Sequence, residues 1–299
     1  MPNKLLIAII GPTAVGKTAV AINLAEELHT EIVSADSRQF YREMEIGTAK
    51  PTAEELKKVP HHFINNLSIH DEYNAGKYEK EAIVSLTELF KKHDKVILAG
   101  GSGLFIDALY KGFDELPDAD LQLRERYENV LKNEGISALQ KELQVKDPAY
   151  YNEVDKNNPR RLIRALEVIH QTGLPYSQFR NKKAVPRDFS ILKIGLHLDK
   201  EILRERIDKR VDDMLEAGWL QECKALYEYR SRNALRTVGY TELFDFIAGN
   251  CDWETTVQNI KTNTWHYAKR QLTWFKKDKE IKWFSPSDID AIQGYIHTH

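Results

Sequence analysis

The segment KLLIAIIGPTAVGKT, residues 4–18, joins a short apolar run to a glycine-rich turn. The run from Lys4 to Ile10 is continuous and rich in β-branched residues, which predicts a strand buried on both faces of a parallel sheet. The turn fits the pattern G-x-x-x-x-G-K-[ST], and apolar side chains then recur at helical spacing from Lys17 to Leu28. Strand, turn and helix in this order predict a site that binds phosphate groups through backbone N–H groups at a helix N-terminus.

The chain beyond this segment alternates between strand and helix patterns. A helical stretch runs from Lys77 to Lys91, and further strands are indicated at 31–35, 95–99 and 191–198. Such alternation predicts an α/β fold, a P-loop NTPase-like parallel sheet flanked by helices.

The region from 117 to 187 has a different pattern. It contains helical segments without a convincing strand, and the pairs Leu116-Pro117 and Val185-Pro186 mark its edges. We therefore expect a catalytic core of residues 1–116 and 188–299, interrupted by a helical insertion domain at 117–187.

The composition excludes several classes of protein. The chain has 299 residues, of which 42% are hydrophobic and 29% charged, so it is neither disordered nor collagen-like. No apolar run approaches the roughly 20 residues of a membrane-spanning helix, and we expect a cytoplasmic protein without a membrane partner.

Positive charge is concentrated in two segments, although the whole chain carries −2. Residues 156–187 contain eight basic side chains and one acidic one, Glu167, which gives +7. Residues 257–284 contain seven basic and two acidic side chains, which gives +5 and leaves the rest of the chain acidic. Two basic segments on an acidic body indicate a protein that directs a polyanion to one place, although each could also be a solvated helical face.

The predicted phosphate site has a defined chemistry. Lys17 can reach the terminal phosphates, and the Thr18 hydroxyl is placed to hold Mg²⁺. Asp36 follows the predicted strand at 31–35, so it should lie across the ligand-binding edge of the sheet from Lys17. A carboxylate there can bind metal or accept a proton from a nucleophile, or it can cap the following helix.

The sequence also resembles a known family, the tRNA dimethylallyltransferases of bacterial type. The resemblance covers nearly the whole chain and rests on eight stretches in the family's order: GPTAVGKT at 11–18, SADSRQFY at 34–41, IGTAKPT at 46–52, PHHF at 60–63, AGGSGLF at 99–105, NNPRRLIRALEV at 157–168, RTVGYTEL at 236–243 and AKRQLTWF at 268–275. It implies transfer of a dimethylallyl group from its diphosphate to N6 of the adenosine beside the anticodon of tRNA, adenosine-37.

The resemblance implies roles for individual residues. Asp36 would accept the proton, with Lys17 and Thr18 as the other catalytic residues and Mg²⁺ held on Thr18. Diphosphate contacts would come from Gly11, Thr13, Ala14, Val15, Gly16, Lys17, Thr18 and either Arg206 or Arg210. These two arginines face away from the apolar stripe of the helix predicted after Lys200, and Arg210 is the one we choose. Contacts to the tRNA anticodon stem-loop would come from Asp36, Ser37, Arg38, Gln39, Ser102, Arg124, Arg160, Arg161, Arg164, Lys269, Arg270 and Gln271. We expect a monomer whose partners are tRNA and dimethylallyl diphosphate.

Three other functions are compatible with a phosphate loop. The chain could be a small-molecule kinase that uses ATP, or an enzyme that prenylates free adenine nucleotides. It could also be an RNA-binding protein that uses nucleotide only for regulation. The two kinds of enzyme leave the basic segments without a purpose, and Asp36 argues against a purely regulatory site.

Overall fold

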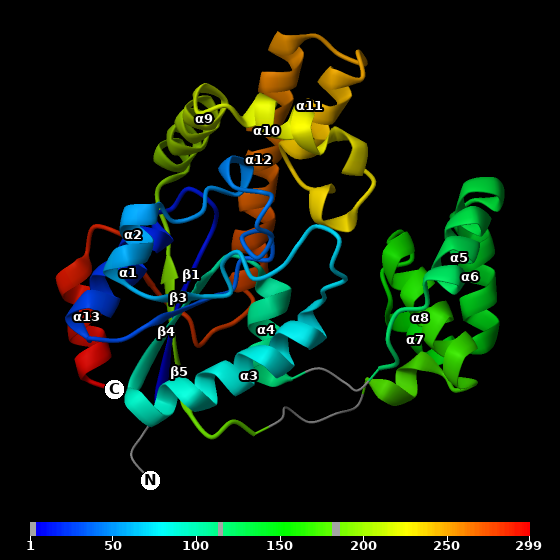
Figure 1. The fold of residues 1–299 in the computed structure, drawn as a ribbon. Coiled ribbons are helices and arrows are strands. Elements are labelled where there is room, and N and C mark those ends of the chain that lie inside the picture. The colour runs from blue at the N-terminus through cyan, green and yellow to red at the C-terminus, as the bar shows by residue number, and fades with distance from the viewer. Residues whose placement is uncertain (1–3, 113–115, 181–185) are drawn as a thin grey trace. The chain divides into compact units, whose positions relative to one another are not determined.

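The computed structural model describes residues 4–112, 116–180 and 186–299. The chain forms two compact units. One consists of residues 1–110 and 187–299, and the other of residues 111–186. In the first unit, strands and helices alternate around one sheet (Figure 1). The predicted α/β fold with a parallel sheet flanked by helices is confirmed.

The sheet has six parallel strands in the order β3-β2-β4-β1-β5-β6. Their bounds are β1 Leu5–Ile10, β2 Ile32–Ser34, β3 His61–His62, β4 Lys95–Gly100, β5 Ser190–Leu196 and β6 Lys282–Phe284. β1 lies between β4 and β5 and every residue in it is buried, as its apolar sequence predicted. β3 and β6 were not predicted from the sequence.

Two hydrophobic cores lie on opposite faces of the sheet, because alternate residues of a strand point to opposite sides. Leu5, Ile7 and Ile9 of β1 join the core under α1 (Lys17–Glu27) and α13 (Ile289–His297). Leu6, Ala8 and Ile10 join the core under α3 (Ala75–Lys92) and α4 (Gly103–Lys111). Both faces of the sheet are therefore covered, which is the usual arrangement for parallel strands.

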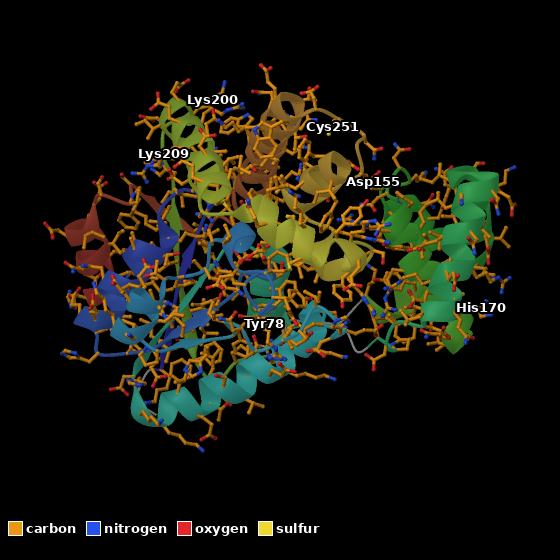
Figure 2. All side chains as sticks on the ribbon, turned by 45° about the horizontal axis from the view of Figure 1, so that its top comes forward. Tyr78, Asp155, His170, Lys200, Lys209 and Cys251 are labelled. Atoms are coloured by element: carbon orange, nitrogen blue, oxygen red, sulfur yellow. The ribbon has the colours of Figure 1, made fainter. Side chains whose placement is uncertain are left out.

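The α3 side of the sheet also fixes the end of β2. Tyr78 on α3 (Figure 2) is fully buried and donates a hydrogen bond of 2.9 Å from its hydroxyl to the backbone oxygen of Ser34. Ser34 is the last residue of β2, so this bond holds the point at which the chain leaves the sheet towards Asp36.

A third core is built from helices beyond the sheet. It joins η1 (Ile46–Thr48), α9 (Lys200–Glu216), α10 (Trp219–Leu226), α11 (Tyr240–Ile247) and α12 (Trp253–Phe275). Trp219 is 2% exposed, and its indole lies where a side chain at Gly47 or Gly239 would be. A Cβ at Gly47 would lie 2.0 Å from the Trp219 Nε1 atom, and one at Gly239 would lie 1.9 Å from the indole ring.

Glu222 of α10 fixes η1 at its start. Its carboxylate accepts hydrogen bonds from the N–H groups of Glu45, Ile46 and Gly47, at 2.9, 2.8 and 3.1 Å, and from the Tyr240 hydroxyl. η1 is thereby attached to α10 and α11. The next short helix along the chain, α2 (Ala53–Lys58), begins with Thr52 and Glu55 in a capping box.

The second unit is helical throughout its regular elements. It consists of α5 (Leu121–Glu134), α6 (Ile136–Lys146), α7 (Pro148–Glu153), α8 (Pro159–Thr172) and η2 (Tyr176–Phe179). The Asn158 side chain accepts a hydrogen bond from the Arg161 N–H, and Pro159 is the first helical residue. Leu162, Leu166 and other apolar residues of α8 form the core of this unit with Tyr127, Leu139 and Leu143.

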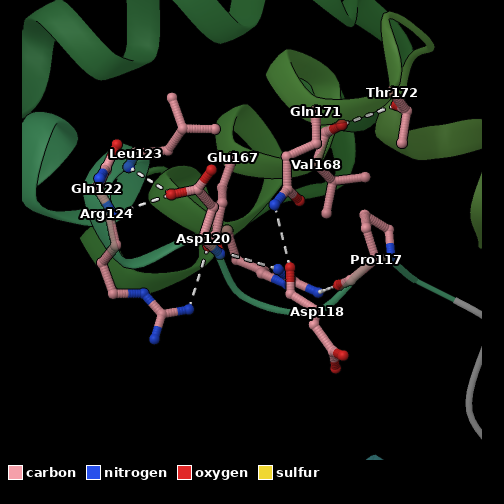
Figure 3. A network of polar contacts seen from close by, with 11 residues as sticks. Pro117, Asp118, Asp120, Gln122, Leu123, Arg124, Glu167, Val168, Gln171 and Thr172 are labelled. Carbon is pink, nitrogen blue, oxygen red and sulfur yellow. Dashed lines mark hydrogen bonds and ion pairs between the residues drawn. The ribbon is translucent and has the colours of Figure 1, made fainter.

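A buried carboxylate, Glu167, organises the start of this helical unit (Figure 3). Its side chain is 0% exposed and forms ion pairs with Arg124 at 3.1 Å and Arg164 at 3.2 Å. It also accepts a 2.7 Å hydrogen bond from the Asp120 N–H, while Arg164 donates to the Pro117 backbone oxygen at 2.7 Å. The network attaches residues 117–124 to α8.

We expect Glu167→Gln to lower the free energy of unfolding of the helical unit by about 1–3 kcal/mol, because two guanidinium groups lose their common carboxylate. Glu153→Gln is the matched control, since Glu153 forms an ion pair with Arg180 while 66% exposed. Such surface pairs contribute at most about 1 kcal/mol. Urea unfolding followed by circular dichroism measures both, and equal losses would contradict a stabilising role for Glu167.

In the described part of the chain, no helix combines the length and the apolar character that crossing a membrane requires.

Candidate active site

The phosphate loop lies between the end of β1 and the start of α1. Gly11 must be glycine, because its φ is +152° and a Cβ would lie 2.7 Å from the Leu196 backbone oxygen. Ala14 and Gly16 also have positive φ, 63° and 106°, which turns the loop back on itself. Gly16 is the N-cap of α1. Because glycine has no side chain, it forms no capping hydrogen bond with the first N–H groups of that helix. Such a loop is an anion-binding concavity.

The Lys17 side chain turns back onto this loop. Its Nζ atom donates a 2.7 Å hydrogen bond to the backbone oxygen of Pro12. Burial lowers the pKa of Lys17 to about 8; the Asp36 carboxylate acts against this shift, and the Arg210 guanidinium adds to it. The ammonium group is thus poorly solvated, and a bound anion would stabilise its charged form.

Asp36 lines one cavity together with Lys17. Lys17, Thr18, Ser34, Asp36 and Gln39 are among its lining residues. The Asp36 Oδ1 atom accepts a 3.0 Å hydrogen bond from the Arg38 N–H, so part of the carboxylate caps the turn after β2. The structure therefore brings the three residues expected to be catalytic, Asp36, Lys17 and Thr18, to one cavity at the carboxyl edge of the sheet.

Two arginines of α9 approach the phosphate loop. Arg206 donates from Nη1 to the Val15 backbone oxygen at 3.4 Å. Burial lowers the pKa of Arg210, and the charge of Asp36 acts against this shift. Arg210 therefore contributes positive charge beside Lys17 and Asp36, while Arg206 contacts the loop directly. The sequence pattern placed both on one face of the helix.

Ser102 and Ser37 join two loops beside Asp36. The Ser37 N–H donates to Ser102 Oγ at 3.0 Å, and Ser102 Oγ donates to Ser37 Oγ at 3.1 Å. Gly100 makes this approach possible, because a Cβ there would lie 2.4 Å from the Ala35 backbone oxygen. The loop after β4 thus lies against the turn that carries Asp36.

The structure adds Tyr267 of α12 to this region. Burial raises the pKa of the Tyr267 phenol to about 12; the Asp36 charge adds to the shift, and Arg38 and Ser102 act against it. Tyr267 therefore lies near the Asp36 carboxylate and remains protonated. In the sequence, Tyr267 lies among other aromatic residues in the basic segment at 257–284.

The remaining candidates for tRNA contact in this unit have different surroundings. Arg38 donates to the backbone oxygens of Asn233 and Ala234, both at 3.1 Å. Gln39 donates to the backbone oxygens of Thr48 and Ala49, at 3.3 and 3.2 Å, which links the cavity to η1. Lys269 and Arg270 are exposed on α12, whereas Gln271 is buried.

In the helical unit, Arg160 and Arg161 are exposed on the first turn of α8. Arg124 and Arg164 are both committed to the ion pairs with Glu167. Exposed guanidinium groups are the ones available to an RNA backbone without breaking a structural contact.

A model of the family described as IPP transferase matches residues 39–278. The chain belongs to the IPP transferase family. The tRNA dimethylallyltransferase of Christiangramia forsetii is 50% identical over 99% of the chain and 100% of its own length. That of Cytophaga hutchinsonii is 47% identical over 98% of the chain and 97% of its own length.

Solved structures of IPP transferases have the same fold. The tRNA isopentenylpyrophosphate transferase of Bacillus halodurans superposes with a TM-score of 0.73 at 36% identity, covering 99% of the chain and 96% of that protein. A eukaryotic dimethylallyltransferase captured acting on tRNA superposes with a TM-score of 0.80 at 28% identity, covering 96% of the chain and 75% of that protein. The predicted resemblance to the family is confirmed.

Proposed function

We propose that the protein transfers the dimethylallyl group of dimethylallyl diphosphate to N6 of adenosine-37 in tRNA, releasing diphosphate. One observation supports this chemistry above the others: Lys17 in the phosphate loop and the carboxylate of Asp36 face a single cavity. In this reaction the diphosphate of the donor leaves as an anion, and the acceptor loses a proton. The reaction therefore requires a cation and a base on opposite sides of the reacting atoms, and Lys17 and Asp36 are such a pair.

The residues of this chain have distinct tasks in the reaction. The carbon–oxygen bond of the donor breaks, and both electrons leave with the diphosphate, which the loop N–H groups, Lys17 and the arginines of α9 stabilise. The N6 lone pair of the adenine forms the new carbon–nitrogen bond. Asp36 accepts the N6 proton as that bond forms. The target base has to leave its stack to reach an enclosed site.

Magnesium fits the oxygen donors of this cavity. The Thr18 hydroxyl and the Asp36 carboxylate are side chains of the kind that Mg²⁺ uses, and no group of three or more metal-binding side chains occurs among the described residues. Mg²⁺ is usually held by one or two protein groups together with phosphate oxygens. We propose that Thr18 holds the ion, which would neutralise charge on the leaving diphosphate.

The tRNA is proposed to be held by both units of the chain. In the helical unit, Arg160 and Arg161 are exposed and can contact phosphates, and Lys269 and Arg270 of α12 can do so in the other unit. We propose that one copy of the chain acts as a monomer. We also propose that it acts in the cytoplasm, where tRNA is available.

The test of this function is one incubation with prenyl-labelled dimethylallyl diphosphate, γ-labelled ATP, total tRNA and AMP. Prenyl label in tRNA, at N6 of one adenosine after nuclease digestion, is the expected result. Prenyl label in AMP instead would indicate a nucleotide prenyltransferase. Label from ATP in phosphate or in a small molecule, with none in tRNA, would indicate a kinase or hydrolase and reject the proposal.

The exposed arginines of α8 give a separate prediction. Replacing Arg160 and Arg161 with alanine should reduce the slope of log affinity for tRNA against log salt concentration by about 0.7–0.9 for each lost phosphate contact. Filter binding at several salt concentrations measures the slope. Lys132→Ala in α5 is the control, and an unchanged slope in the double variant would show that this end of α8 does not touch RNA.

A further inference from the structure

A buried amide of α12 joins two loops of the candidate active site. Gln271 is 7% exposed, although glutamine is usually a surface residue. Its Oε1 atom accepts a 2.8 Å hydrogen bond from the Thr13 N–H in the phosphate loop. Its Nε2 atom donates a 2.8 Å hydrogen bond to the backbone oxygen of Gly101 in the loop after β4. The two bonds use both polar ends of one side chain.

The backbone around Gln271 is shaped to admit it. A Cβ at Gly101 would lie 2.4 Å from the Gln271 Nε2 atom and 3.4 Å from the Gly11 backbone oxygen. Any side chain at 101 would therefore displace the amide. The absence of a side chain at 101 lets the two loops and α12 approach each other.

The two bonds connect the donor side of the site to its acceptor side. Thr13 belongs to the loop proposed to hold the diphosphate. Gly101 precedes Ser102, whose hydroxyl is bonded to both the N–H and the hydroxyl of Ser37. Ser37 follows Asp36 directly in the chain. A continuous series of hydrogen-bonded and covalently linked groups thus runs from the phosphate loop to the proposed proton acceptor.

We propose that Gln271 is a positioning residue that sets the distance between the diphosphate loop and the turn that carries Asp36. This inference rests on the proposed function. The carbon that migrates and the nitrogen that accepts it must be within about 3–3.5 Å of each other, and a displacement of about 1 Å lowers the rate roughly 100-fold. In this role Gln271 acts without touching either substrate, whereas the sequence predicted a direct tRNA contact.

Two substitutions of Gln271 distinguish its bond to the Thr13 N–H from its bond to the Gly101 oxygen. Gln271→Met keeps the length of the side chain and removes both. Gln271→Glu keeps an acceptor for the Thr13 N–H but faces the Gly101 oxygen with a carboxylate, so only the link to the acceptor side is lost. Gly101→Ala alters the same contact from the loop after β4, because the added Cβ displaces the Gln271 amide. Gln258→Met is the matched control, because Gln258 is an exposed glutamine of the same helix.

The measurements are the single-turnover rate of prenyl transfer and the separate dissociation constants for dimethylallyl diphosphate and tRNA. We expect all three variants to lose about 100-fold in rate. The dissociation constants of Gln271→Met should stay near those of wild type. Its melting temperature should fall, because the Thr13 N–H and the Gly101 oxygen lose their partner, so the rate is compared for the folded fraction. The control should match wild type throughout. A residue that only stabilised the fold would lower the melting temperature and leave the rate of the folded fraction unchanged.

Three outcomes would overturn the inference. A normal rate in both Gln271 variants would show that the link is dispensable. A loss of diphosphate affinity equal to the loss of rate would make Gln271 a ligand of the donor. A loss confined to tRNA affinity would make it an RNA contact. If wild-type protein itself transferred no prenyl group to tRNA, the proposed function would fail instead, so the two failures are distinguishable.

Discussion

Asp36→Asn is expected to lower the rate of prenyl transfer by about two to four powers of ten and to leave tRNA affinity unchanged. The amide is nearly identical in shape to the carboxylate, and its oxygen can still accept the hydrogen bond from the Arg38 N–H. The turn after β2 should therefore persist. What the variant lacks is a group that takes up the N6 proton while the carbon–nitrogen bond forms.

Single-turnover transfer from labelled dimethylallyl diphosphate to tRNA measures this effect, with filter binding for tRNA affinity. Asp290→Asn is a suitable control, since Asp290 is an exposed carboxylate on α13. A rate close to wild type in Asp36→Asn would remove Asp36 from the mechanism. A parallel loss of tRNA affinity would assign it to binding.

The second large effect is expected for Lys17→Met. A charge-assisted hydrogen bond contributes about 1.5–3 kcal/mol, so loss of the ammonium group should weaken binding of dimethylallyl diphosphate by about one to two powers of ten. Turnover should also fall, because the charge on the leaving group grows as its bond to carbon breaks. Lys200→Met, which alters an exposed lysine at the start of α9 (Figure 2), should change neither.

The same lysine predicts how binding depends on pH. Burial lowers the pKa of Lys17 to about 8 in the free protein, and the diphosphate favours the protonated form. Above pH 8 the free lysine is neutral, so binding requires proton uptake and the affinity should fall about tenfold for each further pH unit. Calorimetric titrations of wild type and Lys17→Met with dimethylallyl diphosphate test this. Their difference removes the titration of the ligand, and a difference that is constant from pH 7 to 9 would contradict the prediction.

The parts of the fold that could be predicted are those encoded locally. β1, the glycine turn and α1 are contiguous, and each has its own periodicity, so their positions follow from about 25 residues of sequence. β3 consists of only His61 and His62, half-buried and without an apolar pattern, and it is a strand because it pairs with β2. β6 is likewise defined by its pairing with β5. Short strands of this kind depend on tertiary contacts that no local pattern contains.

The candidate site likewise contains some residues whose position could be predicted from local sequence and others whose position depends on tertiary packing. Lys17 and Asp36 could be placed because each follows a strand whose carboxyl end faces the ligand edge. The surroundings of Arg124 and Arg164 could not be predicted, because they depend on how α5 packs against α8 and on one buried carboxylate. The available signal was that Glu167 is the single acid in a strongly basic segment. The contacts of Tyr267 and Gln271 likewise depend on where α12 passes the sheet.

The indole of Trp219 has a consequence for how related sequences can differ. At Gly47 two rings stand in the way of a side chain, because a Cβ there would lie 2.0 Å from Trp219 Nε1 and 2.5 Å from Cε2 of the buried Tyr240. At Gly239 a backbone φ of +89° favours glycine whatever its neighbour. A smaller residue at position 219 alone would therefore admit alanine at neither position. Across natural variants, a side chain at 47 should require changes at both 219 and 240, while position 239 stays invariant.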